Sequence, residues 1–478
     1  MKRMKTLHEK LSKYSQSDYY GFHMPGHKRV LGECGNPYEI DITEIDGFDD
    51  LHHPEENGIL NRAQERAARL YGSEETHFLI NGSTAGILSA ISACTRRGGR
   101  ILAARDCHRS VYHGIALQNL DVTYIYPQLV PKLGINGSIL PEDVEKVLEK
   151  YPDVQAVVLT SPTYDGICSD VKRISEIAHG KKIPVIVDQA HGAHFPFHEK
   201  FPQDAIRLGA DVVIHSVHKT LPSLTQTALL HVNGNLVDRE RLRMFLGVYQ
   251  TSSPSYILMA SIDQCMEFLE TRGKEPFDRQ LDLLEQFYEE CVGLKRLILM
   301  NESVRDGRTV WDMDVSKLLC FTIGTSWSGK QLGKYLLEKF HIQMEMNTCS
   351  YSLGISTVAD TKEGFERLRE ALYSLDLQLR DDIVRTQEYS STRLPRPVAG
   401  CSIGIALDLP KEQVERSECL GRMAGSFVYL YPPGIPLLAP GEVITEEVLD
   451  RMAFWDARGM EIHGLGEQGT VCVLRDKK

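Results

Sequence analysis

From about residue 60 onward, short apolar runs alternate with amphipathic stretches. The runs are continuous and rich in β-branched residues, which is typical of buried strands in a parallel sheet. Between them, PEDVEKVLEK is the clearest helix, because Pro141 fits the first turn and Val144 and Leu148 share one face. The alternation predicts a three-layer α/β domain with a mainly parallel sheet. Its predicted strands are His77–Ile80, Arg100–Ala104, Val122–Tyr126, Ala156–Thr160, Val185–Val187 and Val212–His215.

The pattern changes after about residue 290. The run LLCFTI, a helix around KQLGKYLLEKF, the run IQMEM and a capped helix starting near Asp360 indicate a smaller α+β domain. The predicted division is an N-terminal arm (1–20), a large domain (21–295) and a C-terminal small domain (296–478). The small domain includes a less periodic segment, 380–478, which contains YPPGIPLLAPGE.

Composition and charge narrow the class of protein. The net charge of -11 repels nucleic acid and anionic membranes, so neither is an expected partner. No apolar run reaches the roughly 18 residues of a membrane span, and the N-terminal residues have no apolar core of a secretion signal. The 11 cysteines include no CxxC pair, which favours reduced thiols over a disulfide framework or a metal site. We therefore expect a cytoplasmic protein without a metal.

A candidate anion site follows the first predicted strand. Asn81, Gly82, Ser83 and Thr84 precede a helical pattern, AGILSAISAC. A glycine, two hydroxyl groups and the N-terminus of a helix together favour a phosphate group. A plain helix cap is the alternative, since serine and threonine cap many helices.

Two further reactive residues follow strands at the same predicted edge of the sheet. Asp188 ends the run Val185–Val187, where a carboxylate needs a cation or hydrogen bonds to balance the loss of water. Lys219 lies on the predicted loop after Val212–His215, where apolar neighbours would lower its pKa enough for a Schiff base. Most lysines are exposed, so Lys219 alone indicates little. The phosphate cradle, Asp188 and Lys219 together supply the three anchors that pyridoxal 5'-phosphate (PLP) requires.

Longer sequence blocks carry a specific resemblance. The chain resembles the ornithine/lysine/arginine decarboxylase family of fold type I PLP-dependent enzymes over nearly its whole length. The blocks that carry it are FHMPGHKR, DITEIDGFDDLHHPEE, NGSTAG, DCHRS, SPTYDG, DQAHGAH, SVHKTLPSLTQ, QTSSPSY and YPPGIPLLAPGE.

This resemblance implies roles for individual residues. Lys219 would carry the cofactor as an aldimine, and Asp188 would face the pyridine nitrogen and keep it protonated. His218 would deliver a proton to the reacting carbon, with Lys219 as the competing donor. His108 would stack on the ring, and His191 would cover or hydrogen-bond it, although a structural role for each histidine stays open. The phosphate ligands would be Gly82, Ser83, Thr84, Ser216 and His218.

The resemblance also implies partners. Ser252, within QTSSPSY, would reach the phosphate of a neighbouring subunit, which makes a homodimer the smallest active unit; a serine-rich turn is the alternative. The FHMPGHK segment is expected to line the entrance of the active site.

The substrate implied by the resemblance is a basic amino acid. Its distal cation needs carboxylates, for which Glu442 is the first candidate and Asp46 the second, with Asp49 and Asp50 nearby. The leading reaction is the decarboxylation of arginine to agmatine in polyamine biosynthesis, followed by that of lysine or ornithine. A different fold type I reaction, such as that of an aminotransferase, and a catalytically silent regulator are more distant alternatives.

Overall fold

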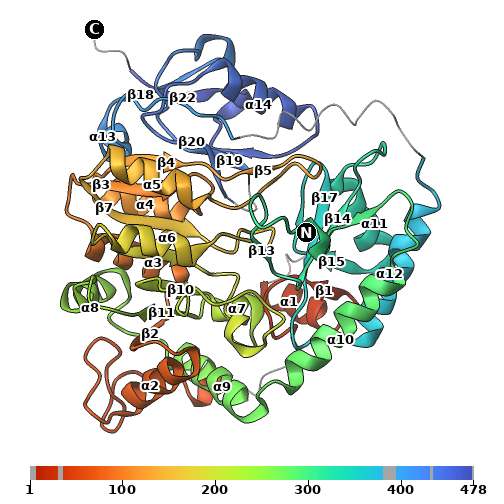
Figure 1. Ribbon diagram of the computed structural model, residues 1–478. Helices are drawn as coiled ribbons and strands as arrows, with labels where there is room; N and C mark the ends of the chain where they lie inside the picture. Colours follow the sequence, from red (N-terminus) through yellow and green to blue (C-terminus); the bar gives the residue numbers. More distant parts are fainter. Residues whose placement is uncertain (1–6, 31–35, 381–393, 431–433, 476–478) are drawn as a thin grey trace, which may run out of the picture.

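The computed structural model describes residues 7–30, 36–380, 394–430 and 434–475 (Figure 1). A seven-stranded sheet in the order β2-β11-β10-β9-β7-β3-β4 forms its centre. All six predicted strands belong to this sheet, and β11, which was not predicted, is its antiparallel member. The predicted mainly parallel sheet is therefore confirmed. The strands are β2 (Glu75–Leu79), β3 (Arg100–Ala104), β4 (Asp121–Ile125), β7 (Val154–Thr160), β9 (Val185–Asp188), β10 (Val212–His215) and β11 (Ala228–Val232).

Helices enclose this sheet. Every residue of β9, β10 and β11 is buried, so both faces of the sheet are covered. Helix α3 packs with α4 and α8, whereas α5, predicted from its amphipathic pattern, packs with α6 (Figure 1). The three-layer architecture is thus confirmed. Its helices are α2 (Ile59–Tyr71), α3 (Gly82–Cys94), α4 (Arg109–Leu117), α5 (Pro141–Lys150), α6 (Val171–His179), α7 (Val217–Thr220), α8 (Arg239–Tyr249), α9 (Tyr256–Arg272) and α10 (Glu275–Glu290).

A four-stranded antiparallel sheet, in the order β12-β14-β17-β16, forms the centre of the smaller α+β part. The predicted run LLCFTI lies in β14, and the helix expected near Asp360 begins at Lys362 with Thr361 as its cap. The elements are β12 (Ile298–Leu299), β14 (Lys317–Phe321), α11 (Gly329–Phe340), β15 (Ile342–Met344), β16 (Met346–Asn347), β17 (Tyr351–Ile355) and α12 (Lys362–Asp376). Two short pairs, β5 (Leu129–Val130) with β6 (Ile135–Asn136) and β8 (Ile167–Cys168) with β13 (Asp312–Met313), lie beside them.

The C-terminal residues have a hydrophobic cluster of their own, whose buried members run from Cys419 to Val473 along the chain. The region 296–478 therefore contains more than one core, and the domain boundaries assigned from the sequence stay predictions. Parts of 380–478, namely 381–393, 431–433 and 476–478, lie outside the described residues. The C-terminal elements are α13 (Ile403–Asp408), β18 (Lys411–Val414), β19 (Val428–Leu430), β20 (Pro436–Leu438), α14 (Glu446–Asp456), β21 (Ile462–His463) and β22 (Val471–Leu474).

The N-terminal segment, with α1 (Leu7–Ser15) and β1 (Tyr20–Phe22), is joined to both main parts of the molecule. Strand β1 pairs in parallel with β15 of the smaller part. Lys28 Nζ donates to the carbonyl of Ile355 at 2.7 Å, and the N–H of Gly26 donates to the carbonyl of His218 at 2.7 Å. The segment that follows β1 is therefore held against the predicted cofactor lysine.

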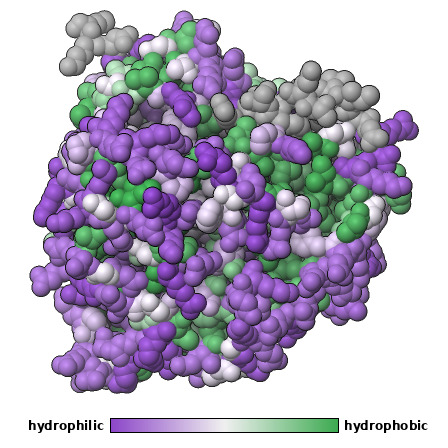
Figure 2. All heavy atoms as spheres, in the orientation of Figure 1, coloured by the Kyte–Doolittle hydropathy of each residue, from purple (hydrophilic) through white to green (hydrophobic). Residues whose placement is uncertain are grey.

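The face of the molecule shown in Figure 2 is mainly hydrophilic, with smaller hydrophobic areas between the polar side chains. Among the described residues, no helix is long and apolar enough to cross a membrane. The ten described cysteines are all free, as expected for reduced thiols. No group of three or more potential metal-binding side chains occurs in the described part of the chain.

Candidate active site

A cavity of about 490 Å³ lies at the carboxyl ends of the central strands. Ligands of open α/β sheets bind at this edge, because loops and helix N-termini with free backbone groups meet there. The turns after β2, β3, β9 and β10 all contribute to the wall. The structure thus brings together eight residues that the sequence assigned to one site: Gly82, Ser83, Thr84, His108, Asp188, His191, His218 and Lys219.

One end of the cavity is suited to a phosphate group. Helix α3 begins at Gly82, whose φ of +73° favours glycine, and Ser83 and Thr84 place hydroxyl groups in its first turn. The free N–H groups of this turn and the helix dipole attract an anion. The donors of this turn fit the phosphate of PLP. Ser216 Oγ is buried and has no hydrogen-bond partner among the described residues, but Ser216 does not line the cavity, and its contact with the phosphate stays a prediction.

Lys219 and Asp188 lie on the wall of the same cavity. Lys219 belongs to the single-turn helix α7 and not, as predicted, to a loop. Burial lowers the pKa of Lys219, and the charges of Asp188 and Glu345 partly offset this effect. Burial raises the pKa of Asp188, and the charge of Lys219 and the hydrogen bond from the N–H of Ala190 oppose this rise. A second cation beside Asp188, such as a protonated pyridine nitrogen, would stabilise its ionised form.

Three histidines of the cavity wall are uncharged near neutral pH. Burial lowers the pKa of His108 to about 3, and its Nδ1 lies 2.9 Å from Ser110 Oγ. Burial also lowers the pKa of His218 to about 4, and its Nδ1 donates to the carbonyl of Thr227 at 2.8 Å. Burial, together with the charges of neighbouring lysines, holds the pKa of His191 well below its usual value. Desolvation disfavours the imidazolium of His218 and so moves its pKa below that of a free imidazole, and its role in proton delivery stays a prediction.

Three carboxyl groups of the cavity were not recognised in the sequence: Asp106, Asp165 and Glu345. Glu345 accepts from Tyr164 Oη at 2.5 Å and from the N–H of Met24 at 3.0 Å. Met24 itself lines the cavity, in agreement with the predicted place of FHMPGHK. Asp106 and Asp165 lie in the quoted blocks DCHRS and SPTYDG, so their positions after strands were the available signal. Glu345 follows a strand of the small domain and has no comparable signal.

The predicted binding of the substrate cation by Glu442 does not fit the structure. Glu442 is 2% exposed, and its two oxygens accept from Arg105 at 2.7 and 3.0 Å. The N–H of Ala439 donates to the same carboxylate at 2.7 Å. Because Glu442 is outside the cavity wall and fully bonded within the chain, its role is that of a buried ion pair.

The remaining predicted residues also lie outside the cavity wall. Asp46 is exposed in the loop before α2, so the structure does not place it beside Lys219. Asp49 is buried and accepts from the N–H of Leu60 at 3.0 Å, at the beginning of α2. Asp50 lies 2.9 Å from His53 Nδ1 at the surface. Ser252 is exposed in this chain, and its contact with a neighbouring subunit stays a prediction.

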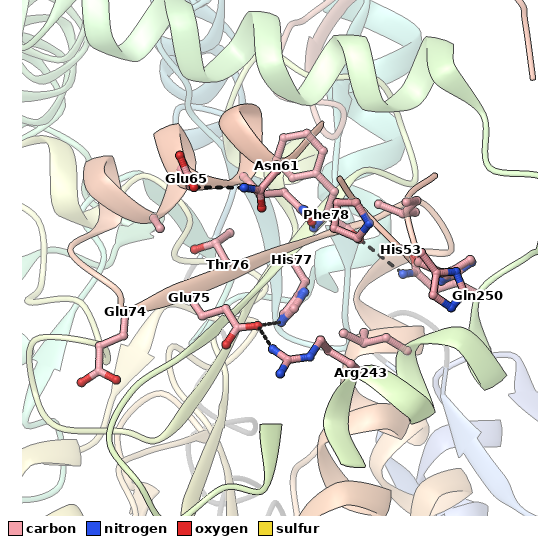
Figure 3. Close-up of a pocket in the computed structure, with 16 residues that line it drawn as sticks. His53, Asn61, Glu65, Glu74, Glu75, Thr76, His77, Phe78, Arg243 and Gln250 are labelled. Atoms are coloured by element: carbon pink, nitrogen blue, oxygen red, sulfur yellow. Dashed lines mark hydrogen bonds and ion pairs between the residues drawn. The ribbon is translucent and has the colours of Figure 1, made fainter. Parts of the chain in front are cut away.

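A second cavity, of about 510 Å³, lies between α2, β2 and α8 (Figure 3). Figure 3 shows the side chains of His77 and Arg243 pointing toward Glu75, which lies 3.0 Å from His77 and 2.6 Å from Arg243. Burial opposes ionisation, but these two partners lower the pKa of Glu75 to about 2. The carboxylate of Glu75 is thus already paired within the chain, whereas the first cavity combines a nucleophilic amine with an anion cradle.

The fold is that of the fold type I PLP-dependent enzymes, and the residues of the cavity fit this cofactor. The structure superimposes on the constitutive lysine decarboxylase of Escherichia coli with a TM-score of 0.78 and 20% identity, covering 92% of this chain and 76% of that one. It also matches an alanine–glyoxylate aminotransferase from Nostoc sp. with a TM-score of 0.54 and 14% identity, over 66% of this chain and 86% of that one. These likenesses establish the fold.

The sequence identifies the family. The profile of the Orn/Lys/Arg decarboxylase major domain matches residues 5–327, and that of the C-terminal domain matches 407–465. An arginine decarboxylase of Bacillus subtilis is 32% identical over 98% of this chain and 97% of its own length. An arginine decarboxylase of Halalkalibacterium halodurans is 32% identical over 95% and 94%, respectively. The chain belongs to the Orn/Lys/Arg decarboxylase family.

Proposed function

We propose that this protein decarboxylates a basic amino acid with PLP as cofactor, and that L-arginine is converted to agmatine and CO2. The observation that carries the proposal is that Lys219, Asp188 and the N-terminus of α3 meet in one cavity. The relatives named arginine decarboxylase, which align over almost the whole chain, support arginine. Lysine is the second candidate, because a 23% identical relative from Pseudomonas aeruginosa is named lysine decarboxylase.

Different residues of the cavity would bind different parts of the cofactor. When bound, PLP supplies a ring that accepts the electron pair left on the α-carbon as CO2 departs. Lys219 would hold the cofactor covalently through its ε-amino group, and Asp188 would keep the proton on the ring nitrogen. Ser83 and Thr84 would bind the phosphate, and the neutral imidazole of His108 would lie against the ring.

Carboxylates of the cavity would bind the distal cation of the substrate. Glu345 and Asp165 line the wall, and they replace Glu442 as candidates. Burial raises the pKa of Asp165 to about 6, so it is ionised near neutral pH and gains further from a guanidinium partner. The planar guanidinium of arginine bonds two oxygens at once, which suits such carboxylates.

Proton delivery to the α-carbon would rely mainly on Lys219. A group with a pKa near the working pH transfers protons most effectively, and burial moves His218 away from that range. His218 would instead keep its place through the hydrogen bond to Thr227 and line the site.

The active unit would be a homodimer. The exposed segment around Ser252 would complete the phosphate site of the neighbouring subunit, as the resemblance to fold type I enzymes implies. This arrangement explains why a predicted phosphate ligand lies outside the cavity of its own chain.

The cofactor assignment is tested by trapping. Purified protein should be yellow, and borohydride should attach the cofactor covalently to the peptide that contains Lys219. Lys219→Ala should lose both properties, whereas Lys200→Ala, at an exposed lysine paired with Glu285, should keep them. Covalent trapping in Lys219→Ala protein, or on another lysine of the wild type, would overturn the assignment.

The substrate is tested with a panel of arginine, lysine, ornithine and neutral amino acids, with amines identified by mass and CO2 measured. Agmatine should be the main product. Cadaverine as the main product would assign lysine instead, and formation of a keto acid without CO2 would make the protein an aminotransferase.

A further inference from the structure

The imidazole of His191 lies between two lysines. Its Nε2 is 3.1 Å from Lys219 Nζ, and its Nδ1 is 3.0 Å from Lys317 Nζ. Lys317 is the first residue of β14, is 0% exposed and comes from the smaller α+β part of the chain. The cofactor lysine is thus linked, through one ring, to a second lysine that the proposed chemistry does not use.

The hydrogen bonds between Lys219, His191 and Lys317 limit how many protons these three side chains can carry together. Burial holds the pKa of His191 well below its usual value, so the ring is neutral and has one N–H and one lone pair. An ammonium group can only donate, and two ammonium groups would require two lone pairs on the ring. At most one lysine is therefore a cation, which donates to His191, and the other is a neutral amine that accepts from it.

The surrounding charges decide which lysine is the cation. Three carboxyl groups act on Lys317, namely Asp314 before β14, Glu345 after β15 and Asp165 after β7. Burial opposes ionisation of Asp314, but His194 and Lys317 lower its pKa, so this fully buried group is an anion. Burial lowers the pKa of Lys317 only to about 8 against these carboxylates, which leaves it mostly protonated at neutral pH.

The charged groups around Lys219 differ from those around Lys317. Asp188 and Glu345 favour its cation, but burial raises the pKa of Asp188 and so disfavours the anion beside Lys219. The remaining titratable groups near the Lys219–His191 contact are His108 and His218, both neutral, and the phenol of Tyr164, whose ring centroid is 4.5 Å from that of His191. The charge is therefore favoured on Lys317, with His191 Nδ1 as acceptor and Nε2–H as donor to Lys219.

We propose that Lys317 is a positioning residue that acts through His191 to hold the ε-amino group of Lys219 in its neutral, nucleophilic form. A neutral amine has the lone pair that attacks a carbonyl or imine carbon, and an ammonium does not. The fixed charge of Lys317 also repels a second positive charge on Lys219 at short range. The inference rests on the proposed function only in naming Lys219 as the cofactor lysine.

The proposal is tested by measuring the protonation of Lys219 directly. The full chain is treated with hydroxylamine to release bound aldehyde and then acetylated with limiting acetic anhydride between about pH 6 and 10. Peptide mass spectrometry gives the extent of reaction at Lys219. The Lys317→Met variant should shift the midpoint upward by at least about one pH unit, which is about a tenfold loss of reactivity near pH 7.

Two variants serve as controls. Lys317→Arg keeps the positive charge and should keep the wild-type midpoint of Lys219, whereas Lys146→Met, at an exposed lysine on α5, should change nothing. Circular dichroism and thermal unfolding identify variants that do not fold. An unchanged midpoint in folded Lys317→Met protein, or an ordinary lysine midpoint in the wild type, would overturn the proposal.

A second measurement needs no variant at Lys317. Nitrogen NMR of the full wild-type chain labelled at histidine, with a His191→Gln sample for assignment, should show His191 protonated at Nε2. Protonation at Nδ1 would mean that Lys219 is the cation, which contradicts the inference. Neither measurement uses decarboxylation, so a protein that releases no CO2 would refute the proposed function and leave this inference standing.

Discussion

Asp106 is a buried carboxyl group on the wall of the cavity, and its Oδ1 has no hydrogen-bond partner among the described residues. Burial, with a smaller effect of the charge of Asp165, raises the pKa of Asp106 from 3.8 to about 7. The folded chain therefore binds a proton that the unfolded chain loses near pH 4. This proton makes its full contribution to the free energy of unfolding below about pH 4. The contribution decreases as the pH rises above 4 and is lost once the pH passes 7.

Asp106→Asn should therefore stabilise the protein at high pH. Because the amide stays neutral, the variant should unfold at a higher temperature than the wild type at about pH 8. The corresponding gain in the free energy of unfolding is at most roughly 4 kcal/mol. The difference should disappear toward pH 4. Thermal unfolding by circular dichroism at both pH values measures it, with the exposed Asp153→Asn as control. An equal difference at both pH values would contradict the raised pKa of Asp106.

At the level of single residues, the sequence identified the site residues that lie close to the carboxyl end of a predicted strand. Asp188 ends one strand of the sheet and Lys219 follows another by four residues, and strands of one parallel sheet end at one edge. Lys317 could not be found in this way, because it starts a strand in the other domain and reaches His191 only through tertiary packing. Glu442 was misassigned for a related reason: a carboxylate in a Pro/Gly-rich loop looks free, and its partner Arg105 is far away in the sequence.

At the level of elements, one ion pair joins the C-terminal elements to the central sheet. Arg105 follows β3, Glu442 follows β20, and their side chains are 1% and 3% exposed. Breaking a buried pair leaves one charge without a partner, which costs more than an exposed pair contributes. The pair therefore fixes the position of the C-terminal residues against the sheet.

Glu442→Ala should lower the free energy of unfolding by about 3–5 kcal/mol, because Arg105 stays buried and uncompensated. Asp153→Ala, which removes one of the two exposed carboxylate partners of Arg100, should cost less than about 1 kcal/mol. The double variant Arg105→Met/Glu442→Leu should recover most of the loss. Urea unfolding measures all three, and a small effect of Glu442→Ala would show that the pair is not what holds these elements together.

Most helices and strands of the sheet were predictable, because the spacing of apolar residues in the sequence matches the side chains that are buried in the structure. The six predicted strands and α5 are present, because short β-branched runs and a clean amphipathic face have few other stable arrangements. Strand β11 was missed, although ALLHV is a continuous apolar run, because only the single-turn helix α7 separates it from β10 and the alternation of strands with longer helices is interrupted. Its antiparallel pairing with β10 is the arrangement that such a short connection allows.

At the level of the whole molecule, the shared active site predicts complementation between inactive subunits. Lys219→Ala removes the cofactor lysine, and Ser252→Trp should block the phosphate site of the neighbouring subunit. A reassembled hybrid dimer then has one site with both residues intact. An equal mixture should recover about a quarter of the wild-type activity, because half of the dimers are hybrids and half of their sites are intact.

Activity assays before and after dissociation and reassembly measure this recovery, with the mass of the assembly determined in solution. No recovery would assign Ser252 to the site of its own chain. Full activity of Ser252→Trp alone, or an active monomer of 53.9 kDa, would contradict a shared site.

The parallel pairing of β1 with β15 has a consequence for biosynthesis. Phe22 emerges from the ribosome long before its neighbour Met344, and at roughly 5–20 residues per second the wait is on the order of tens of seconds. During this time Met24 has no partner at Glu345, and the wall of the cavity beside it is incomplete. A nascent chain that stops before β15 would therefore contain the lysine and the phosphate cradle without a closed site, so premature products of translation should be inactive.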